Sequence, residues 1–410
     1  MNYRKNIELL FTDPKIVVRK AEHKLLRKIG GGRLLGFPPS AAIIAEARKM
    51  LQDAQKDTVF LFPLPSCPWG YMFQRPQQIA KVLSRMGYPV IYMTDTSFPY
   101  EPDWSVRGLH ELDANLYLYN DNQNGALLST ILSGYQVCVW QYWPHQTQVV
   151  EHIRHAHTIR SRFIYDYIDH LTTFDSYPQM EQDYETSIKG ADLIVCTAKR
   201  LFDEVQSLAT YDAQVLLVPN GVHVNDFKMS THVDPNPSKQ PIRVGYYGAI
   251  AEWFDFDAMD YAAEMNPTYE FVFVGEVYPE VQQQVHQLSK RANVTFLPRV
   301  GYEQIPDLLN SFHVAVLPFL KNDITDHTSP VKVFEYAAGG KVTVASPLPE
   351  IDGLPYIRFA DNAKEFSKQL ALAVGESLDR SYAKKIRSHS EHYSWEGRLE
   401  PVISWLYSKG

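Results

Sequence analysis

The stretch HTSPVKVFEYAAGGKVTVAS, from His327 to Ser346, is typical of a loop, a helix, a glycine turn and a buried strand in succession. Thr328 or Ser329 has a side chain that can cap a helix, and Pro330 suits a first helical turn. Gly339–Gly340 predicts the end of that helix. The apolar run that follows predicts a strand covered on both faces, and this succession is typical of an α/β fold.

The same stretch also predicts a ligand site. Lys332 and Glu335 are three residues apart and therefore share one helix face. The helix start at Ser329, Pro330 and Val331 would attract a diphosphate together with the lysine, through the free N–H groups of residues other than the proline. A glutamate one turn later can accept hydrogen bonds from both hydroxyls of a ribose. The alternative is a surface ion pair worth a few tenths of a kcal/mol.

Apolar runs recur on both sides of this stretch, and helical segments separate most of them. A polar, proline-rich segment, Ser230–Pro241, divides the runs into two groups. We therefore expect two doubly wound α/β domains, each with a parallel sheet that binds ligands at the carboxyl edge. The runs are TVFLFPLP, PVIYMT, NLYLYN, QVCVWQYW, RFIYDYI, DLIVC and QVLLVPNG, then IRVGYYGAI, YEFVFVGEV, NVTFLPRV, VAVLPF, KVTVAS and YIRFA.

The boundaries expected from these patterns divide the chain into four parts. Residues 1–55 form a basic, partly helical extension, and residues 56–235 form the first domain. Residues 236–381 form the second domain. Residues 382–410 are helical, with Trp395 and Trp405 available for packing.

The composition of the chain excludes several classes of function. The chain has 410 residues and a formal net charge of −7, which argues against bulk binding of nucleic acid. Three widely spaced cysteines argue against a disulfide framework or a structural zinc site and fit a reducing cytoplasm. No signal peptide or apolar run of 18 residues is present, so we expect a cytoplasmic protein. A basic amphipathic helix within residues 1–35 either lies on the inner face of the membrane or packs on its own domain.

Three further stretches resemble known enzymes when read in order with the first. These are PWGYMFQRPQQIA (Pro68–Ala80), YDYID (Tyr165–Asp169) and VPNGV (Val218–Val222). Over residues 57–410 the chain resembles the GT-B glycosyltransferases of the retaining family-4 type, in particular the bacterial enzymes of polysaccharide and teichuronic-acid assembly. The resemblance implies two Rossmann-like domains facing across a cleft, with the C-terminal helix crossing back to the first domain. It implies a hexosyltransferase-type enzyme that needs no cofactor or metal and uses a nucleoside diphosphate sugar and a glycan or lipid-linked acceptor.

The resemblance also assigns donor residues to the second domain. Glu335 matches the second glutamate of the family's Glu-x7-Glu motif, which holds the ribose. His327 stands where the first glutamate would contact the donor sugar, so His327 or the neighbouring Asp326 takes that role.

The largest departure from the family lies after Gly248. Many members carry an arginine and a lysine there that clamp the diphosphate, whereas the stretch Gly248–Phe256 has neither. Stabilising the charge of the leaving group is the main demand of this reaction. We expect Lys332 and the helix start to supply that charge, with Arg299 and Arg75 as further candidates. For each of these two arginines, a purely structural role is the alternative to binding the diphosphate.

In the first domain, the resemblance points to the end of the strand RFIYDYI. Asp166 and Asp169 are the candidates for orienting the acceptor or stabilising the reacting centre, although Asp169 suits a turn as well. Trp69 and Gly70 are expected to line the acceptor site. His145 is either an acceptor contact or a structural histidine.

Asp255 and Asp257 resemble a metal-binding DxD motif, but their position before a helix favours an N-cap. Two other functions stay open. The missing clamp is compatible with a non-catalytic protein that binds a glycan or a partner, and the fold class also includes sugar-nucleotide epimerases and inverting transferases.

Overall fold

The computed structural model describes residues 40–65, 67, 69, 73–94, 108–120, 126–156, 158–173, 177–208, 213–229 and 241–408. The predicted basic helix within residues 1–35, Gly70 and all of the predicted linker Ser230–Pro241 except Pro241 lie outside these residues.

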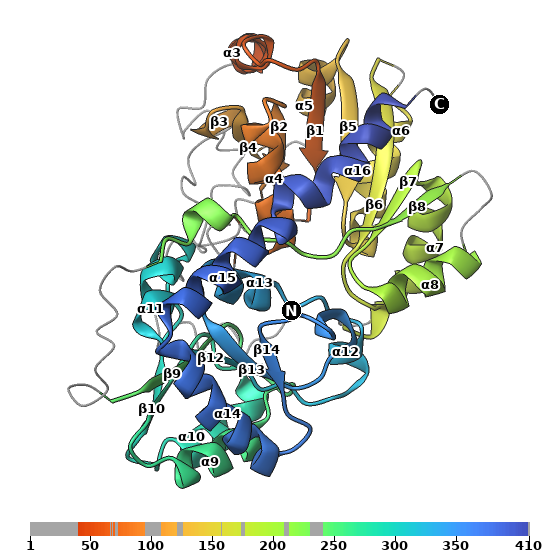
Figure 1. Cartoon of the computed structure of the whole chain (residues 1–410). Coiled ribbons are helices and arrows are strands. Elements are labelled where there is room, and N and C mark those ends of the chain that lie inside the picture. The colour runs from red at the N-terminus through yellow and green to blue at the C-terminus, as the bar shows by residue number, and fades with distance from the viewer. Residues whose placement is uncertain are drawn as a thin grey trace, which may run out of the picture. The chain divides into compact units, whose positions relative to one another are not determined.

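The first sheet has eight strands in the order β3-β4-β2-β1-β5-β6-β7-β8 (Figure 1). All seven apolar runs of the first group form strands of this sheet, and their pairings are parallel where registers are defined. The exception is β3, which pairs antiparallel with β4. Its sequence, GLHELD, is too polar for the pattern of a buried strand. The strands are β1 (Thr58–Phe62), β2 (Val90–Met93), β3 (Gly108–Asp113), β4 (Leu116–Asn120), β5 (Gln136–Gln141), β6 (Arg160–Tyr167), β7 (Leu193–Cys196) and β8 (Gln214–Leu217).

Six α-helices and three short 3₁₀ turns accompany these strands in the described part of the chain. They are α3 (Ser40–Gln52), α4 (Arg75–Arg85), α5 (Ala126–Leu132), α6 (Thr147–Arg154), α7 (Met180–Gly190), α8 (Lys199–Leu208), η1 (Pro144–Gln146), η2 (Leu171–Thr173) and η3 (Val224–Asp226).

Helix α3 packs against the first sheet. Its apolar residues Ile43, Ala47 and Leu51 are buried in the same core as strands β1 and β2. Arg48 donates hydrogen bonds to the carbonyl oxygens of Thr130 and Ser133, at 2.8 and 3.1 Å. The end of the predicted extension, residues 40–52, is therefore part of the folded first unit.

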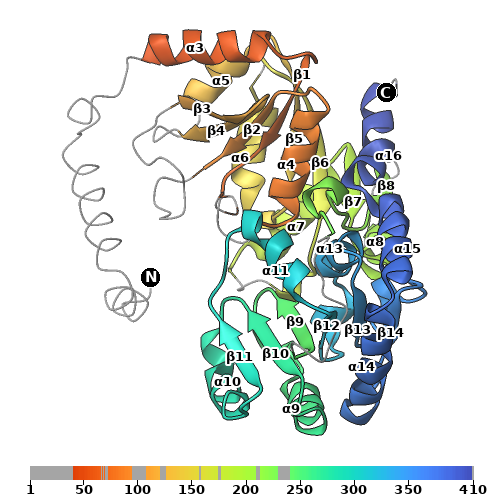
Figure 2. The same ribbon diagram turned by 60° about the vertical axis from the view of Figure 1, so that its left-hand side comes forward.

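The second sheet has six strands in the order β11-β10-β9-β12-β13-β14, and every pairing is parallel (Figure 2). All six apolar runs of the second group form its strands. They are β9 (Arg243–Tyr247), β10 (Glu270–Val274), β11 (Val294–Leu297), β12 (Val314–Leu317), β13 (Val342–Ala345) and β14 (Ile357–Phe359).

The helices of this region include the one predicted from the opening stretch. They are α9 (Phe256–Met265), α10 (Gln282–Leu288), α11 (Ile305–Ser311), α12 (Asp323–Asp326), α13 (Val331–Ala338), α14 (Ala363–Ser377), α15 (Arg380–Ser390) and α16 (Trp395–Tyr407). Trp395 and Trp405 of α16 are buried, which confirms the prediction that they pack. The Asp255 side chain accepts a hydrogen bond from the Ala258 N–H and caps α9, as predicted.

Both sheets are doubly wound. In the second sheet the chain order is 3-2-1-4-5-6, and the first sheet has the same order from β4 through β7. This is the order of Rossmann-like folds, whose ligands bind where the strand order reverses. The GT-B expectation of two Rossmann-like domains is thus confirmed.

Contacts divide the chain into two compact units that differ from the expected domain boundaries. The first unit extends to Tyr165 and includes Gln179–Asp192, and the second unit holds Asp166–Pro178 and the chain from Leu193 onward. Within the second unit, Val222 bonds to the segment before α16 through its N–H and its carbonyl oxygen. The end of the first sheet is therefore tied to the C-terminal helices.

Candidate functional site

The two reversal points of the sheets locate the candidate sites. In the second sheet the reversal falls between β9 and β12, and in the first between β1 and β5. The connections that leave the carboxyl ends of these four strands carry most of the predicted site residues.

The start of α13 is built differently from the expectation. Pro330 is the N-cap, and neither Thr328 nor Ser329 caps the helix with its hydroxyl. Thr328 instead donates to the Ile324 carbonyl oxygen. The Ser329 hydroxyl accepts from the Asn220 N–H at 3.2 Å, and its carbonyl oxygen accepts from the Asn220 side-chain amide at 2.6 Å. No side chain caps the first turn of α13, so the backbone N–H groups of that turn can bind an anion.

Lys332 lies against the carboxyl end of β9. Its ammonium nitrogen is 5.8 Å from the centre of the Tyr246 ring. Gly248 has a φ of +134°, and a Cβ there would overlap the Lys332 side chain. Surrounding protein lowers the pKa of Lys332, and the charge of Glu335 opposes that shift. Lys332 therefore brings positive charge to the turn in which the family's arginine and lysine are missing.

Glu335 is a buried carboxylate on the same helix, with only 5% of its surface exposed. The Tyr247 hydroxyl donates to its Oε2 atom at 2.7 Å. Burial raises the pKa of Glu335 to about 6, whereas the Tyr247 hydrogen bond and Lys332 act in the opposite direction. A buried carboxylate with a raised pKa, at a reversal point of the sheet, is a typical candidate for a ligand contact.

The two arginine candidates lie in different units. Arg299 is exposed and follows β11, two strands from β9. Arg75 is buried and is the first residue of α4 in the first unit. Of the three basic candidates, Lys332 is therefore the one that lies beside Gly248 and on the same helix as Glu335.

His327 lies beside the loop that follows β6. Its ring stacks on His170, with 4.9 Å between ring centres and 27° between planes. Its Nδ1 donates to the Asp323 carbonyl oxygen at 2.6 Å, so a neutral His327 presents Nε2 as an acceptor. Asp326, the alternative to His327, forms an ion pair with Arg200 at 2.9 Å.

Asp166 and Asp169 both belong to the second unit, with His327. Asp166 is fully buried near the end of β6, and Asp169 is half-buried in the loop that leads to His170. Among the contacts described, His170 joins this loop to His327.

In the first unit, the acceptor candidates surround the reversal point between β1 and β5. The Trp69 ring packs edge-on against Tyr92 at 5.1 Å. His145 lies in η1 and stacks on Trp143 at 5.1 Å. Burial lowers the pKa of His145, while Asp183 opposes that shift.

Buried hydrogen bonds hold these connections in place. Gln146 accepts from the Tyr142 and Trp143 N–H groups and donates to the carbonyl oxygens of Pro63 and Pro65, each at 2.8 Å. It thereby ties the segment after β5 to the segment after β1.

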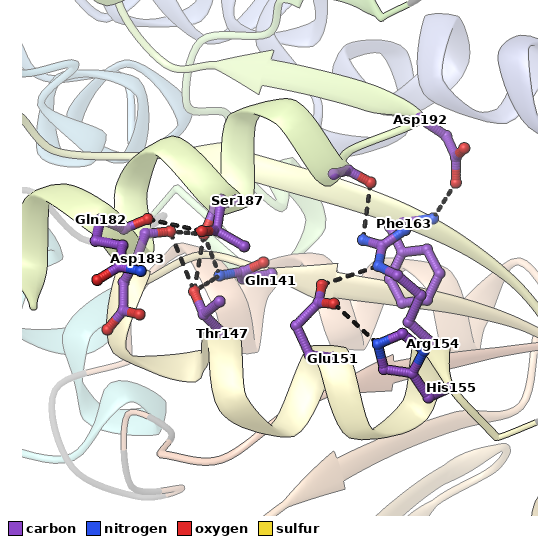
Figure 3. Close-up of polar contacts among 12 residues, drawn as sticks. Gln141, Thr147, Glu151, Arg154, His155, Phe163, Gln182, Asp183, Ser187 and Asp192 are labelled. Atoms are coloured by element: carbon purple, nitrogen blue, oxygen red, sulfur yellow. Dashed lines mark hydrogen bonds and ion pairs between the residues drawn. The ribbon is translucent and has the colours of Figure 1, made fainter.

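A second buried group anchors the start of α6. Gln141 donates to the Thr147 and Ser187 hydroxyls, which also bond to one another at 3.0 Å (Figure 3). Ser187 belongs to α7, so the group joins β5, α6 and α7. This arrangement fixes the start of α6, which follows His145 and η1, to β5 and α7.

Among the described residues, no helix has both the length and the apolar character needed to span a bilayer. No cluster of three or more candidate metal ligands occurs in the same residues.

Comparison with known proteins shows which sequences and folds this chain resembles. Residues 257–404 match the family model described as "Glycosyl transferase-like". The chain is 24% identical over 228 residues to the Bacillus subtilis (strain 168) protein TuaH, which is assigned as a teichuronic acid biosynthesis glycosyltransferase. The match covers 53% of this chain and 57% of that relative, so the chain spans little more than half the length of TuaH.

Solved structures establish the fold. Sucrose-phosphate synthase from Thermosynechococcus elongatus aligns over 86% of this chain and 98% of its own, with a TM-score of 0.63 and 15% identity. Anabaena Alr3699/HepE in complex with UDP-glucose aligns over 86% of this chain and 100% of its own, with a TM-score of 0.62 and 13% identity. The chain therefore has the GT-B fold.

Sequence reasoning did not find four residues of the site. Tyr247 and His170 contact predicted residues, Asn220 braces the start of α13, and Glu204 lies 3.7 Å from His170. Asn220 carried a signal, because it belongs to the VPNGV stretch. The others contact residues far away in the chain and have no local pattern.

Proposed function

We propose that this protein is a glycosyltransferase that moves a sugar from a nucleoside diphosphate sugar to a glycan or lipid-linked acceptor. The observation that carries the proposal is the pair formed by Lys332 and the buried Glu335, at the start of α13 beside Gly248. The family match over residues 257–404 covers this pair.

The chemistry follows from the charges of the site. Lys332 and the amides at the start of α13 bind the diphosphate, and Glu335 accepts hydrogen bonds from the ribose hydroxyls. The bond between the anomeric carbon and the diphosphate oxygen breaks as the acceptor oxygen bonds to the same carbon. The acceptor proton passes to the leaving diphosphate, so no strong protein base is needed. This proton transfer requires the acceptor to approach on the face from which the diphosphate leaves, so we propose retention of configuration. The family resemblance is the basis on which we propose a hexosyl donor.

On the acceptor side, Asp166 or Asp169 orients the acceptor hydroxyl, with Trp69 and His145 as further contacts. We propose that the reaction needs no metal and serves the assembly of a cell-surface polysaccharide. Residues 1–35 are proposed to contact the inner face of the membrane, where lipid-linked acceptors are found.

A thermal-shift screen tests the donor site. The protein and its Glu335→Gln variant are heated with UDP-, GDP-, dTDP- and CMP-sugars, with and without EDTA. A ligand that binds only the folded state raises Tm by mass action. We expect one nucleotide class to raise the Tm of the wild-type protein by several degrees in EDTA and the variant to lose that shift.

The same screen, followed by analysis of the products formed from the nucleotide sugar that binds, separates the alternatives. The absence of a shift with all nucleotides at millimolar concentration would reject the transferase and leave the glycan- or partner-binding protein. Conversion of the donor sugar without an acceptor would identify an epimerase. Product of the opposite anomeric form would identify an inverting enzyme.

A further inference from the structure

Tyr247 is the one described residue that forms a hydrogen bond with the Glu335 side chain. It is the last residue of β9, and its ring and hydroxyl are buried. The ring packs edge-on against Tyr336 of α13, with 5.2 Å between ring centres. The hydroxyl is therefore held by two elements and points at the carboxylate.

The Tyr247 hydroxyl bonds to only one of the two carboxylate oxygens of Glu335. Oε2 accepts from Tyr247 at 2.7 Å, and the described residues supply no hydrogen bond to Oε1. Glu335 has two rotatable bonds beyond its Cβ, so burial alone does not select the direction of its oxygens. The Tyr247 hydroxyl does select it, and Oε1 is left for a ligand.

The same hydroxyl favours the ionised carboxylate. A hydrogen bond donated to the charged form lowers a pKa, and burial acts in the opposite direction. The other groups around this pair act by charge. Lys332 favours ionisation and Asp226 of η3 disfavours it, while Tyr336 and Tyr302 lie near the Tyr247 hydroxyl.

We propose that Tyr247 is a positioning residue, which holds the Glu335 carboxylate ionised and directs its Oε1 atom toward the sugar hydroxyls of a bound nucleotide. This inference rests on the proposed function, because it concerns the same donor site. It assigns a role to a residue that the motif on α13 does not contain.

Calorimetric titration with UDP-glucose between pH 5 and pH 8 tests the role. UDP-glucose is the suitable probe because its diphosphate is a diester, whereas the terminal phosphate of UDP titrates near pH 6 and would confuse the profile. The proteins are wild type, Tyr247→Phe, Glu335→Gln and Tyr336→Phe. The last is the matched control, because it also loses one buried tyrosine hydroxyl, which bonds to the Val316 carbonyl oxygen at 3.4 Å.

We expect wild-type affinity to fall as Glu335 takes up its proton, with a midpoint near pH 6. Tyr247→Phe should weaken binding about 10-fold at pH 7.5, the size of one hydrogen bond to a charged group, and should move the midpoint upward by about one pH unit. Glu335→Gln should bind weakly at every pH. Tyr336→Phe should stay within about twofold of wild type with an unchanged midpoint.

Two results would overturn the inference while leaving the donor site intact. One is a Tyr247→Phe protein with wild-type affinity and midpoint. The other is an affinity loss that is uniform with pH and equal to that of Tyr336→Phe, as a merely structural role would produce. If wild type binds no nucleotide sugar in the thermal-shift screen, the proposed function fails and the inference falls with it.

Discussion

At the residue scale, Glu335 shows a conflict between stability and ligand binding. Its carboxylate is almost fully buried, and the pKa is raised to about 6 from an ordinary value of 4.5. A folded-state pKa above the unfolded one stabilises the fold below pH 4.5, and this contribution is lost as pH rises through 6. At neutral pH the ionised side chain therefore costs stability, as is common for residues kept for function.

We predict that Glu335→Gln is more stable than wild type at pH 7.5, by about 2 kcal/mol, the linkage value for a shift of this size. The neutral side chain keeps an oxygen to accept from Tyr247. Urea unfolding at pH 4.5 and pH 7.5 measures the effect, because the advantage of the variant should be confined to the higher pH. A variant less stable than wild type at pH 7.5 would contradict the prediction.

Some residues of the candidate site could be predicted from the sequence, and others could not. Lys332 and Glu335 were predicted because helical spacing places them on one face, a local property. Tyr247 could not be predicted in its role, because it meets Glu335 only when β9 and α13 pack together. The same holds for the stacking of His170 on His327, which are far apart in the chain.

At the element scale, the turn after β9 is adapted to close packing. Gly248 has a φ of +134°, where other residues are strained, and a side chain there would collide with Lys332. A Cβ on Gly275, after β10, would likewise overlap the Gly248 carbonyl oxygen. Two adjacent strands thus end in glycines, which lets Lys332 lie directly over the backbone.

We predict that Gly248→Ala weakens nucleotide-sugar binding at least 10-fold, because the new methyl group displaces Lys332. The strained φ should also cost about 1–3 kcal/mol of stability. Gly353→Ala is the control, since Gly353 also has a positive φ (+77°) but a Cβ added there would meet open space. It should lose stability and keep its affinity, and calorimetry with UDP-glucose compares the two. Equal affinity in the two variants would show that Lys332 does not bind the donor.

At the scale of the whole molecule, the second unit is closed by contacts between distant parts of the chain. The Val222 N–H donates to the Tyr393 carbonyl oxygen at 2.9 Å, and the Trp395 N–H donates to the Val222 carbonyl oxygen at 3.2 Å. Trp395 is fully buried, and a Cβ on Gly221 would lie only 2.8 Å from that same Tyr393 oxygen. The stretch after the first sheet therefore packs directly against the start of α16.

We predict that Trp395→Ala lowers the free energy of unfolding by about 3–5 kcal/mol, as expected for loss of a buried tryptophan. Tyr407→Ala, on the same helix, should change it by less than about 0.5 kcal/mol because Tyr407 is 60% exposed. Denaturant unfolding followed by circular dichroism measures both. A loss below 1 kcal/mol for Trp395→Ala would mean that this contact does not hold the unit together.

The sequence by itself determined the two α/β halves, their parallel strands, the helix at 331–338 and the placement of Lys332 and Glu335 on that helix. These features follow from periodicity, turn residues and spacing, which act over a few residues. Only the tertiary structure decided that β3 runs antiparallel, that Asn220 rather than a local hydroxyl braces α13, and that residues 166–178 pack with the C-terminal chain. It also decided that Glu335 is buried against Tyr247. Such contacts join residues far apart in the chain, and no local pattern encodes the partner that packing will supply.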